Sequence, residues 1–183
     1  MNYKPGQVIA KFTSKKGKEI ELRIPKLGDE QGYLDFINSI IDEDDYILYN
    51  QPVSFEEEKI WLAKTVGDII KGKALYLTAF YDDLIIGNAS LGTCKGRKGH
   101  VAGFGITIKN GYREEGISTM MMETLFTEAK KMGIKLIDLG VYCTNKRAIN
   151  AYKKMGFVEH GILPKAISHR GNYIDELLMH RHL

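Results

Sequence analysis

The sequence predicts an α/β fold with a mixed, mostly antiparallel central sheet and helices on both faces. Strand-like and helix-like segments are interspersed along the chain, three consecutive strands are joined by short turns, and the last strands alternate with helices. A chain of 183 residues can bury one substantial core. We therefore expect one domain over residues 1–183, with an N-terminal β-hairpin at about residues 7–24.

Periodicity and turn residues predict the elements of the first half. Strand-like runs at 7–13 and 19–24 flank a polar link, and Asp29 is expected to cap a helix whose apolar residues recur with helical spacing. Ser54 and Glu57 form a capping box, which predicts the start of a second helix. Three β-rich runs then predict an antiparallel meander over residues 74–80, 84–90 and 99–108.

The second half alternates helices with strands. Apolar residues follow helical spacing over 116–132, and Gly133 stands where a helix-terminating glycine is typical. A buried strand is predicted at 135–141 and a short helix at 145–154. The last strand is expected at 173–179, which completes a mixed sheet with helices against it.

The charge balance predicts no nucleic-acid partner. The chain has 26 basic and 23 acidic residues, and the net charge of +3 is too small to indicate a nucleic-acid partner by itself. A nucleic-acid binder that uses basic loops remains a third hypothesis, which predicts a steep salt dependence of binding. The densest basic runs are interpreted as solvated hairpin tips and comprise Lys15, Lys16, Lys18, Lys95, Arg97 and Lys98.

Cysteine and histidine spacing indicates neither a disulfide framework nor a metal site. Cys94 and Cys143 do not form a CxxC motif, and the five histidines lack a metal-binding spacing. The sequence has no run of 18 apolar residues and no apolar core of a signal peptide. We therefore expect a cytoplasmic protein with no metal and no membrane partner.

The order of elements before the predicted helix 116–132 is typical of an anion-binding site. A strand leads through a turn and Gly116 directly into the helix. The first amides of a helix lack intrahelical acceptors and lie at the positive end of the helix dipole, so a pyrophosphate can accept several of them. Gly116 lets the backbone approach a ligand without a Cβ. An ordinary capping turn is the alternative interpretation.

Asn145 and Tyr152 are seven residues apart in the predicted helix 145–154. This spacing is about two helical turns, so both side chains lie on one face. An amide and a phenol therefore face the same groove. A helix N-cap for Asn145 and a half-buried core aromatic for Tyr152 remain open alternatives.

These two segments resemble motifs of the GNAT superfamily of N-acetyltransferases. The coenzyme-A loop of that superfamily reads Arg/Gln-x-x-Gly-x-Gly/Ala, and residues 113–118 read Arg-Glu-Glu-Gly-Ile-Ser, with Ser118 where Gly or Ala is customary. The following motif, Asn-x-x-Ala-x-x-x-Tyr-x-x-x-Gly-Phe, is matched by residues 145–157. The resemblance covers roughly residues 19–183 and implies the acyl-CoA N-acyltransferase fold.

The resemblance implies a site for acetyl-CoA between strands 103–108 and 135–141. The N–H of Ile106 would polarise the thioester, Asn145 would hydrogen-bond the pantetheine, and the amides of 114–118 would hold the pyrophosphate. The implied general acid is Tyr152, whose hydroxyl would protonate the departing thiolate. The residues implied to bind the cofactor are Ile106, Thr107, Ile108, Arg113, Glu114, Glu115, Gly116, Ile117, Ser118 and Asn145.

Two departures from the family pattern concern charge. Glu114 and Glu115 stand where many relatives carry Gly and a basic residue, and carboxylates beside an anionic ligand repel it. Gly103 stands where many relatives have a Glu that deprotonates the amine. Because an amine with a pKa of about 10 must lose a proton before it attacks, another base is needed. The candidates are a water chain, Glu21, the acidic run 42–45, Asp175 and His100.

We expect an N-acetyltransferase that moves acetyl from acetyl-CoA to a primary amine by direct attack in a ternary complex. The acceptor remains open among a small amine, an amino acid, an antibiotic, a protein N-terminus and a lysine side chain. The alternative hypothesis is a non-catalytic, regulatory coenzyme-A-binding module of the same fold. Besides the amine, a second copy of the chain is a possible partner. Such a homodimer would be joined through sheet edges.

Overall fold

Eight strands and four α-helices make up the computed structural model, which describes residues 3–43 and 46–183. The strands are β1 (Val8–Thr13), β2 (Glu19–Arg23), β3 (Ala74–Tyr81), β4 (Leu84–Thr93), β5 (Val101–Ile108), β6 (Leu136–Tyr142), β7 (Val158–His169) and β8 (Asn172–His182). The helices are α1 (Glu30–Ile41), α2 (Phe55–Ile70), α3 (Ile117–Lys131) and α4 (Lys146–Lys154), and a short 3-10 turn η1 (Gly96–Lys98) lies between β4 and β5.

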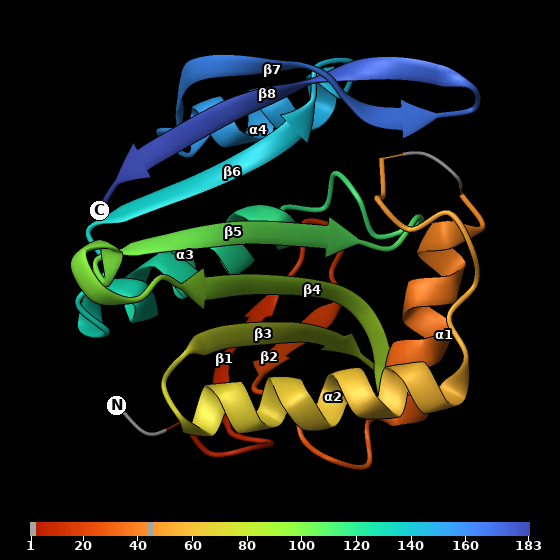
Figure 1. Ribbon diagram of the computed structural model, residues 1–183. Coiled ribbons are helices and arrows are strands. Elements are labelled where there is room, and N and C mark those ends of the chain that lie inside the picture. Colours follow the sequence, from red (N-terminus) through yellow and green to blue (C-terminus); the bar gives the residue numbers. More distant parts are fainter. Residues whose placement is uncertain (1–2, 44–45) are drawn as a thin grey trace.

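All eight strands form one sheet in the order β1-β2-β3-β4-β5-β6-β8-β7 (Figure 1). Every neighbouring pair is antiparallel except β5 and β6, which are parallel. The predicted mixed, mostly antiparallel sheet is therefore confirmed.

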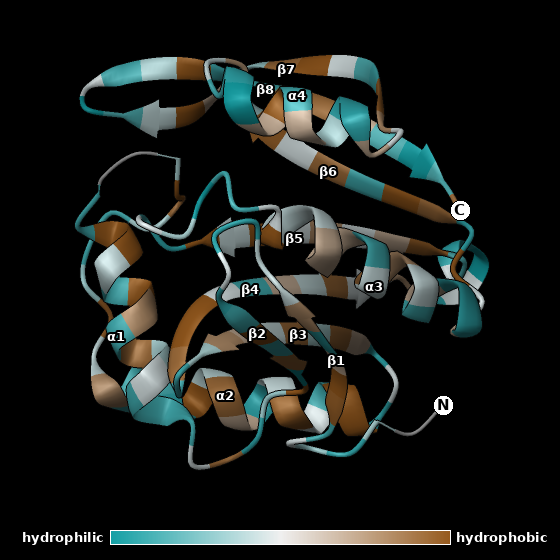
Figure 2. Cartoon of the chain, turned by 180° about the vertical axis from the view of Figure 1, so that it is seen from behind, coloured by the Kyte–Doolittle hydropathy of each residue, from teal (hydrophilic) through white to brown (hydrophobic). Residues whose placement is uncertain are grey.

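The helices cover both faces of the sheet, as the sequence predicts. α1 and α2 lie on one face and α3 and α4 on the other, as the two opposite views show (Figures 1 and 2). The larger apolar core lies on the α3 and α4 side, and a smaller one lies between α1, α2 and the sheet. No helix within residues 3–43 and 46–183 is both long enough and apolar enough to span a membrane.

The two predicted helix caps have different outcomes. At α2 the capping box is confirmed, because Ser54 Oγ accepts the Glu57 N–H and Glu57 in turn accepts the Ser54 N–H at 2.8 Å. Such a cap stabilises a helix by about 1 kcal/mol. At α1 the predicted side-chain cap is wrong. The Asp29 carboxylate instead accepts two hydrogen bonds from the Arg23 guanidinium, at 2.8 and 2.9 Å, and a bidentate charged pair is stronger than a cap.

The C-terminal hairpin is longer than the sequence predicts. Only residues 173–179 are expected to be a strand, yet β7 and β8 contain 12 and 11 residues and form an edge of the sheet. Most residues of β7 are exposed, Ile162 and Leu163 among them, so its sequence lacks the alternation that identifies a half-buried strand.

Candidate active site

A cleft opens where the two parallel strands separate. β5 and β6 pair over three residues each, and the pairing ends at Gly103 and Asp138. Beyond this point the strands diverge (Figure 1). Their facing backbone edges do not pair with each other there, so an extended ligand can hydrogen-bond to them. The volume of the cleft is about 780 Å³.

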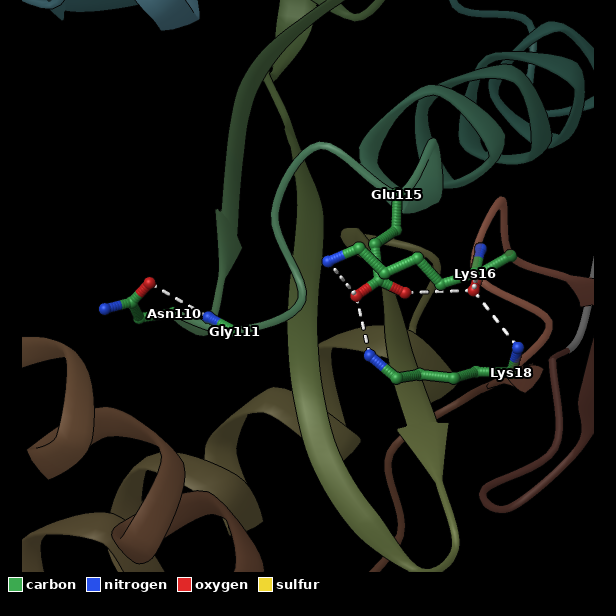
Figure 3. Close-up of polar contacts among 6 residues, drawn as sticks. Lys16, Lys18, Asn110, Gly111 and Glu115 are labelled. Atoms are coloured by element: carbon green, nitrogen blue, oxygen red, sulfur yellow. Dashed lines mark hydrogen bonds and ion pairs between the residues drawn. The ribbon is translucent and has the colours of Figure 1, made fainter.

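The cleft brings together the site residues predicted from the sequence, with one exception. Its lining includes Ile106, Thr107, Ile108, Arg113, Glu114, Gly116, Ile117, Ser118, Asn145 and Tyr152. Glu115 is the exception, because its side chain is turned away from the cleft, toward the hairpin of β1 and β2 (Figure 3).

The N-terminus of α3 presents free amides to the cleft. Gly116 is the N-cap, its φ is +83°, and no side chain caps the helix. A residue with a Cβ would be strained at this angle, so glycine is required by the backbone as well as by access. The amides of Ile117, Ser118 and Thr119 begin the helix and have no intrahelical acceptor. This end of the cleft therefore suits an anion.

The Glu115 carboxylate is fully buried and neutralised by the β1–β2 hairpin. It accepts hydrogen bonds from Lys18 Nζ at 2.6 Å and from Ser14 Oγ at 3.0 Å, and Lys16 Nζ lies 3.4 Å away (Figure 3). These contacts, the Lys18 hydrogen bond foremost, hold the pKa of Glu115 below its ordinary value. The expected repulsion of a phosphate by Glu115 is therefore wrong, since its charge is paired on the far side of the loop.

Lys15 joins the cleft as a consequence of this contact. Its backbone N–H donates to Glu115 O at 3.0 Å, and its side chain lies against Gly116 and lines the cleft. Lys15 and Lys16 are exposed, as expected for a solvated hairpin tip, but the tip also packs against the loop before α3. Tertiary packing of the hairpin against this loop distinguishes the basic run at 15–18 from the one at 95–98.

The Arg113 side chain stabilises the turn between β5 and α3. Its Nε donates to Ile108 O at 2.8 Å, and its guanidinium forms an ion pair with Glu43 at 2.5 Å. Glu43 also accepts the N–H of Asn110. Asn110 in turn accepts the N–H of Gly111 with its side chain (Figure 3). Arg113 thus fixes the loop whose amides face the cleft.

Asn145 and Tyr152 lie on α4 and line the cleft together, as their spacing predicts. Asn145 Oδ1 caps α4 by accepting the Ala148 N–H at 3.1 Å, and its side-chain NH2 group has no partner among the described residues, so it can donate to a ligand. Tyr152 is 9% exposed and packs edge-on against Phe104. Burial raises the pKa of Tyr152 to about 12, so the hydroxyl stays protonated at neutral pH.

The opposite end of the cleft is walled by aromatic and apolar side chains that the sequence analysis missed. Tyr46 packs edge-on against Tyr142, with ring centroids 5.5 Å apart, and the Tyr142 hydroxyl donates to Ile47 O. The other residues at this end include Ile37, Ile40, Leu48, Tyr49, Ile167 and Glu176. Several belong to the segment after α1, where no periodic signal identifies a binding residue.

The structure shows which of the candidate bases line the cleft. Asp42, Glu21, Asp175 and His100 do not line the cleft, whereas Glu43 does but is paired with Arg113. The Glu21 carboxylate pairs with Lys11, and Asp175 accepts the Lys165 N–H. Asp44 and Asp45 lie outside the described residues. Glu176, which the sequence analysis did not single out, lines the cleft.

Metal chemistry finds no support in the side chains. Within the part of the chain that the structure describes, no group of three or more His, Cys, Asp or Glu residues has the arrangement of a metal site. Cys94 and Cys143 are both free thiols.

Comparison with known proteins agrees with this geometry. A sequence model of the Acetyltransferase (GNAT) family matches residues 34–157. The L-amino acid N-acetyltransferase AaaT of Escherichia coli (strain K12) is 29% identical over 107 residues, which are 57% of this chain and 66% of that protein. The alignment thus spans just under two thirds of that protein.

Solved structures share the fold over nearly the whole chain. The acetyltransferase of the GNAT family from Streptococcus pneumoniae has a TM-score of 0.80 at 24% identity, over 90% of this chain and 99% of that one. RimL, a ribosomal-protein alpha-N-acetyltransferase in complex with coenzyme A, has a TM-score of 0.81 at 18% identity, over 97% of this chain and 98% of that one. Since the family model also matches more than half of the sequence, the chain belongs to the acetyltransferase (GNAT) family.

Proposed function

We propose that this chain transfers acetyl from acetyl-CoA to a primary amine by direct attack of the amine within a ternary complex. The observation that carries the proposal is the meeting of three features in one cleft. These are the free amides of α3, the open edge of β5 beyond Gly103, and the hydroxyl of Tyr152, which lines the cleft. Family membership and the coenzyme A bound to RimL support the choice of cofactor.

The side chains and amides of the cleft fit acetyl-CoA. The amides of 114–118 would hold the pyrophosphate, although Glu115 contributes only its backbone. Lys15 adds a cation beside Gly116. The backbone of Ile106, Thr107 and Ile108 would pair with the pantetheine arm as an added strand does, and the NH2 group of Asn145 would donate to it.

Acetyl-CoA supplies the acetyl group as a thioester and leaves as a thiol. The Ile106 N–H would stabilise the negative charge that develops on the carbonyl oxygen. The hydroxyl of Tyr152 would donate its proton to the sulfur, because it remains protonated throughout the physiological range. Burial of Tyr152 against Phe104 fixes the ring and limits access of water to the proton.

The apolar lining at the far end of the cleft favours acceptors whose amine is attached to an apolar or aromatic group. Tyr46, Leu48, Tyr49, Tyr142 and Ile167 line this end, and Tyr46 packs against Tyr142. AaaT is named for L-amino acids and RimL for a ribosomal-protein N-terminus, and both kinds of acceptor are primary amines.

The test is release of free thiol from acetyl-CoA in the presence of single amines. The panel comprises 2-phenylethylamine, L-phenylalaninamide, L-phenylalanine, and peptides that offer either a free N-terminus or a lysine. Saturable thiol release with one acceptor class supports the proposal and identifies the substrate class. Tight binding of acetyl-CoA without release on any amine supports the regulatory module instead.

A further inference from the structure

We propose that Glu176 is the base that removes the proton from the acceptor amine. The inference rests on the proposed function. In it, Glu176 takes the role of the carboxylate that is missing at Gly103. Glu176 lies on β8 opposite Tyr142 of β6, and its side chain lines the cleft at the end away from α3.

Gly140 lets the Glu176 side chain cross β6. A Cβ built on Gly140 would lie 2.6 Å from Glu176 Cδ, a distance that real Cβ atoms almost never show, and 3.1 Å from its Cγ, which is tighter than most real Cβ contacts. Any other residue at position 140 would push this side chain away. The glycine therefore holds open the space through which the carboxylate reaches from β8 toward the gap between β5 and β6.

The carboxylate arrives on the face of the sheet where the customary base would be. In β5, Gly103 and Gly105 are exposed and alternate with the buried Ala102 and Phe104, so they face away from the core formed with α3. In β6, Gly140 is likewise exposed between two buried residues. Glu176 thus extends over the same face that a side chain at position 103 would occupy.

Among the described residues, Glu176 is also an unengaged carboxylate at the acceptor end of the cleft, whereas the unengaged Glu114 is an exposed residue of the loop before α3. The Glu176 side chain has no hydrogen bond or ion pair among residues 3–43 and 46–183, whereas Glu43 is held by Arg113. Titratable groups near this end include Tyr46, Tyr49, Tyr142, Cys143, His169 and Asp175. A half-buried carboxylate among aromatic walls attracts a cationic amine and can accept its proton directly or through one water.

Asp138 is the competing carboxylate on this face. Its Oδ1 lies 3.9 Å from the position of a Cβ at Gly103. However, it lies where β5 and β6 are still paired, and it does not line the cleft. Position therefore favours Glu176, and Asp138 provides a matched control.

Three proton transfers accompany the acetyl transfer, two from the nitrogen and one to the sulfur. The ammonium form of the acceptor gives one proton to the Glu176 carboxylate, and the freed nitrogen lone pair forms the C–N bond to the acetyl carbonyl carbon. As the tetrahedral centre collapses, the second N–H proton passes to water, the C–S bond breaks, and the Tyr152 hydroxyl protonates the sulfur. Solvent then exchanges protons with Glu176 and Tyr152 and restores both groups.

The test compares Glu176→Gln with wild type on two aromatic amines that differ in basicity. For 2-phenylethylamine, which is largely protonated at neutral pH, we expect kcat/KM to fall at least ~100-fold. For L-phenylalaninamide, whose amino pKa is about 8, the loss is smaller because more of the amine is already neutral. The Kd for acetyl-CoA stays within about twofold of wild type, since Glu176 lies at the acceptor end.

A pH profile separates a base from a structural residue. In wild type, the acid limb of kcat/KM reports the base, whereas in Glu176→Gln it follows deprotonation of the free amine alone. Asp175→Asn and Asp138→Asn make the same chemical change at neighbouring carboxylates and keep wild-type rates and profiles. Gly140→Ala keeps the carboxylate but displaces it, and it reproduces the loss seen for Glu176→Gln.

Two results would overturn the assignment of Glu176 as the base without contradicting the proposed function. One is a Glu176→Gln variant with the rate and pH profile of an active wild type, and the other is the loss appearing in Asp138→Asn instead. If the wild type itself releases no thiol with any amine, the proposed function fails, and this inference fails with it.

Discussion

The Glu115 carboxylate accepts a hydrogen bond from Lys18 Nζ at 2.6 Å, and this contact joins the N-terminal hairpin to the loop that begins α3 (Figure 3). Ser14 and Lys16 complete the cluster. Because the tip of the hairpin is held in this way, the intervening Lys15 lies beside Gly116. A hairpin outside the family's two motifs thus contributes to the cleft.

Replacing Glu115 with Gln should lower stability in a pH-dependent way. The pKa of Glu115 is below its ordinary value of 4.5, so the ionised group stabilises the fold fully above about pH 4.5, and that contribution is lost as the pH falls through the depressed pKa. Thermal melts across pH should give a lower Tm for Glu115→Gln at pH 7 and a shrinking difference in acid. The same change at the exposed Glu114 should have little effect at either pH, and equal effects at both sites would contradict the account.

Lys15→Ala should weaken acetyl-CoA binding while Lys98→Ala leaves it unchanged. Lys15 is the basic side chain beside Gly116, whereas Lys98 is exposed in η1. One partly exposed charged contact to phosphate contributes on the order of 1 kcal/mol, so KM for acetyl-CoA should rise about fivefold. S-acetylpantetheine, which lacks the nucleotide phosphates, should be used equally by both variants. A loss for Lys15→Ala with that donor as well would exclude a phosphate contact.

Tyr152→Phe should separate catalysis from binding. Removing the hydroxyl should lower kcat about 100-fold or more, as for other general acids, and leave the Kd for acetyl-CoA nearly unchanged. Because the pKa of Tyr152 is raised to about 12, deprotonation of Tyr152 should not lower wild-type kcat/KM below pH 10. Wild type and variant should therefore have the same pH profile up to that pH. An undiminished kcat in Tyr152→Phe would show that the proton reaches the sulfur from another source.

Glu58→Gln should stabilise the protein in alkali and not in acid. Glu58 is 5% exposed in α2, and burial raises its pKa to about 7. As the pH rises from about 4.5 to 7, Glu58 loses its proton in the unfolded chain before it does so in the folded protein. The free energy of unfolding of the wild type therefore falls by roughly 2–3 kcal/mol over that range. Chemical denaturation at pH 8 should show the variant more stable, with no difference near pH 4. The exposed neighbour Glu56→Gln should change little at both pH values.

Local patterns predicted the parts of the site that are built within one segment. The spacing of Asn145 and Tyr152, and the glycine before α3, are properties of a few consecutive residues, and the structure brings these residues to one cleft. The capping box at Ser54 and Glu57 was predictable for the same reason.

Contacts between distant segments could not be read from the sequence. The approach of Lys18 to Glu115, and of the Glu176 side chain to Gly140, depends on how the hairpins pack and on the strand order. At Asp29, a local rule predicted a cap, but Arg23 on the adjacent strand forms a stronger pair with the carboxylate. Alternation in β8 could have indicated Glu176, since Leu177 and Met179 are buried and Glu176 faces the other way.

The most direct test of the central claim is calorimetric titration of the protein with acetyl-CoA, followed by measurement of thiol release in the same sample after addition of 2-phenylethylamine or L-phenylalaninamide. We expect saturable binding of one acetyl-CoA per chain and thiol release that depends on the amine and requires Tyr152. Absence of acetyl-CoA binding would contradict the cofactor site, and binding without release on any amine of the panel would contradict the transferase.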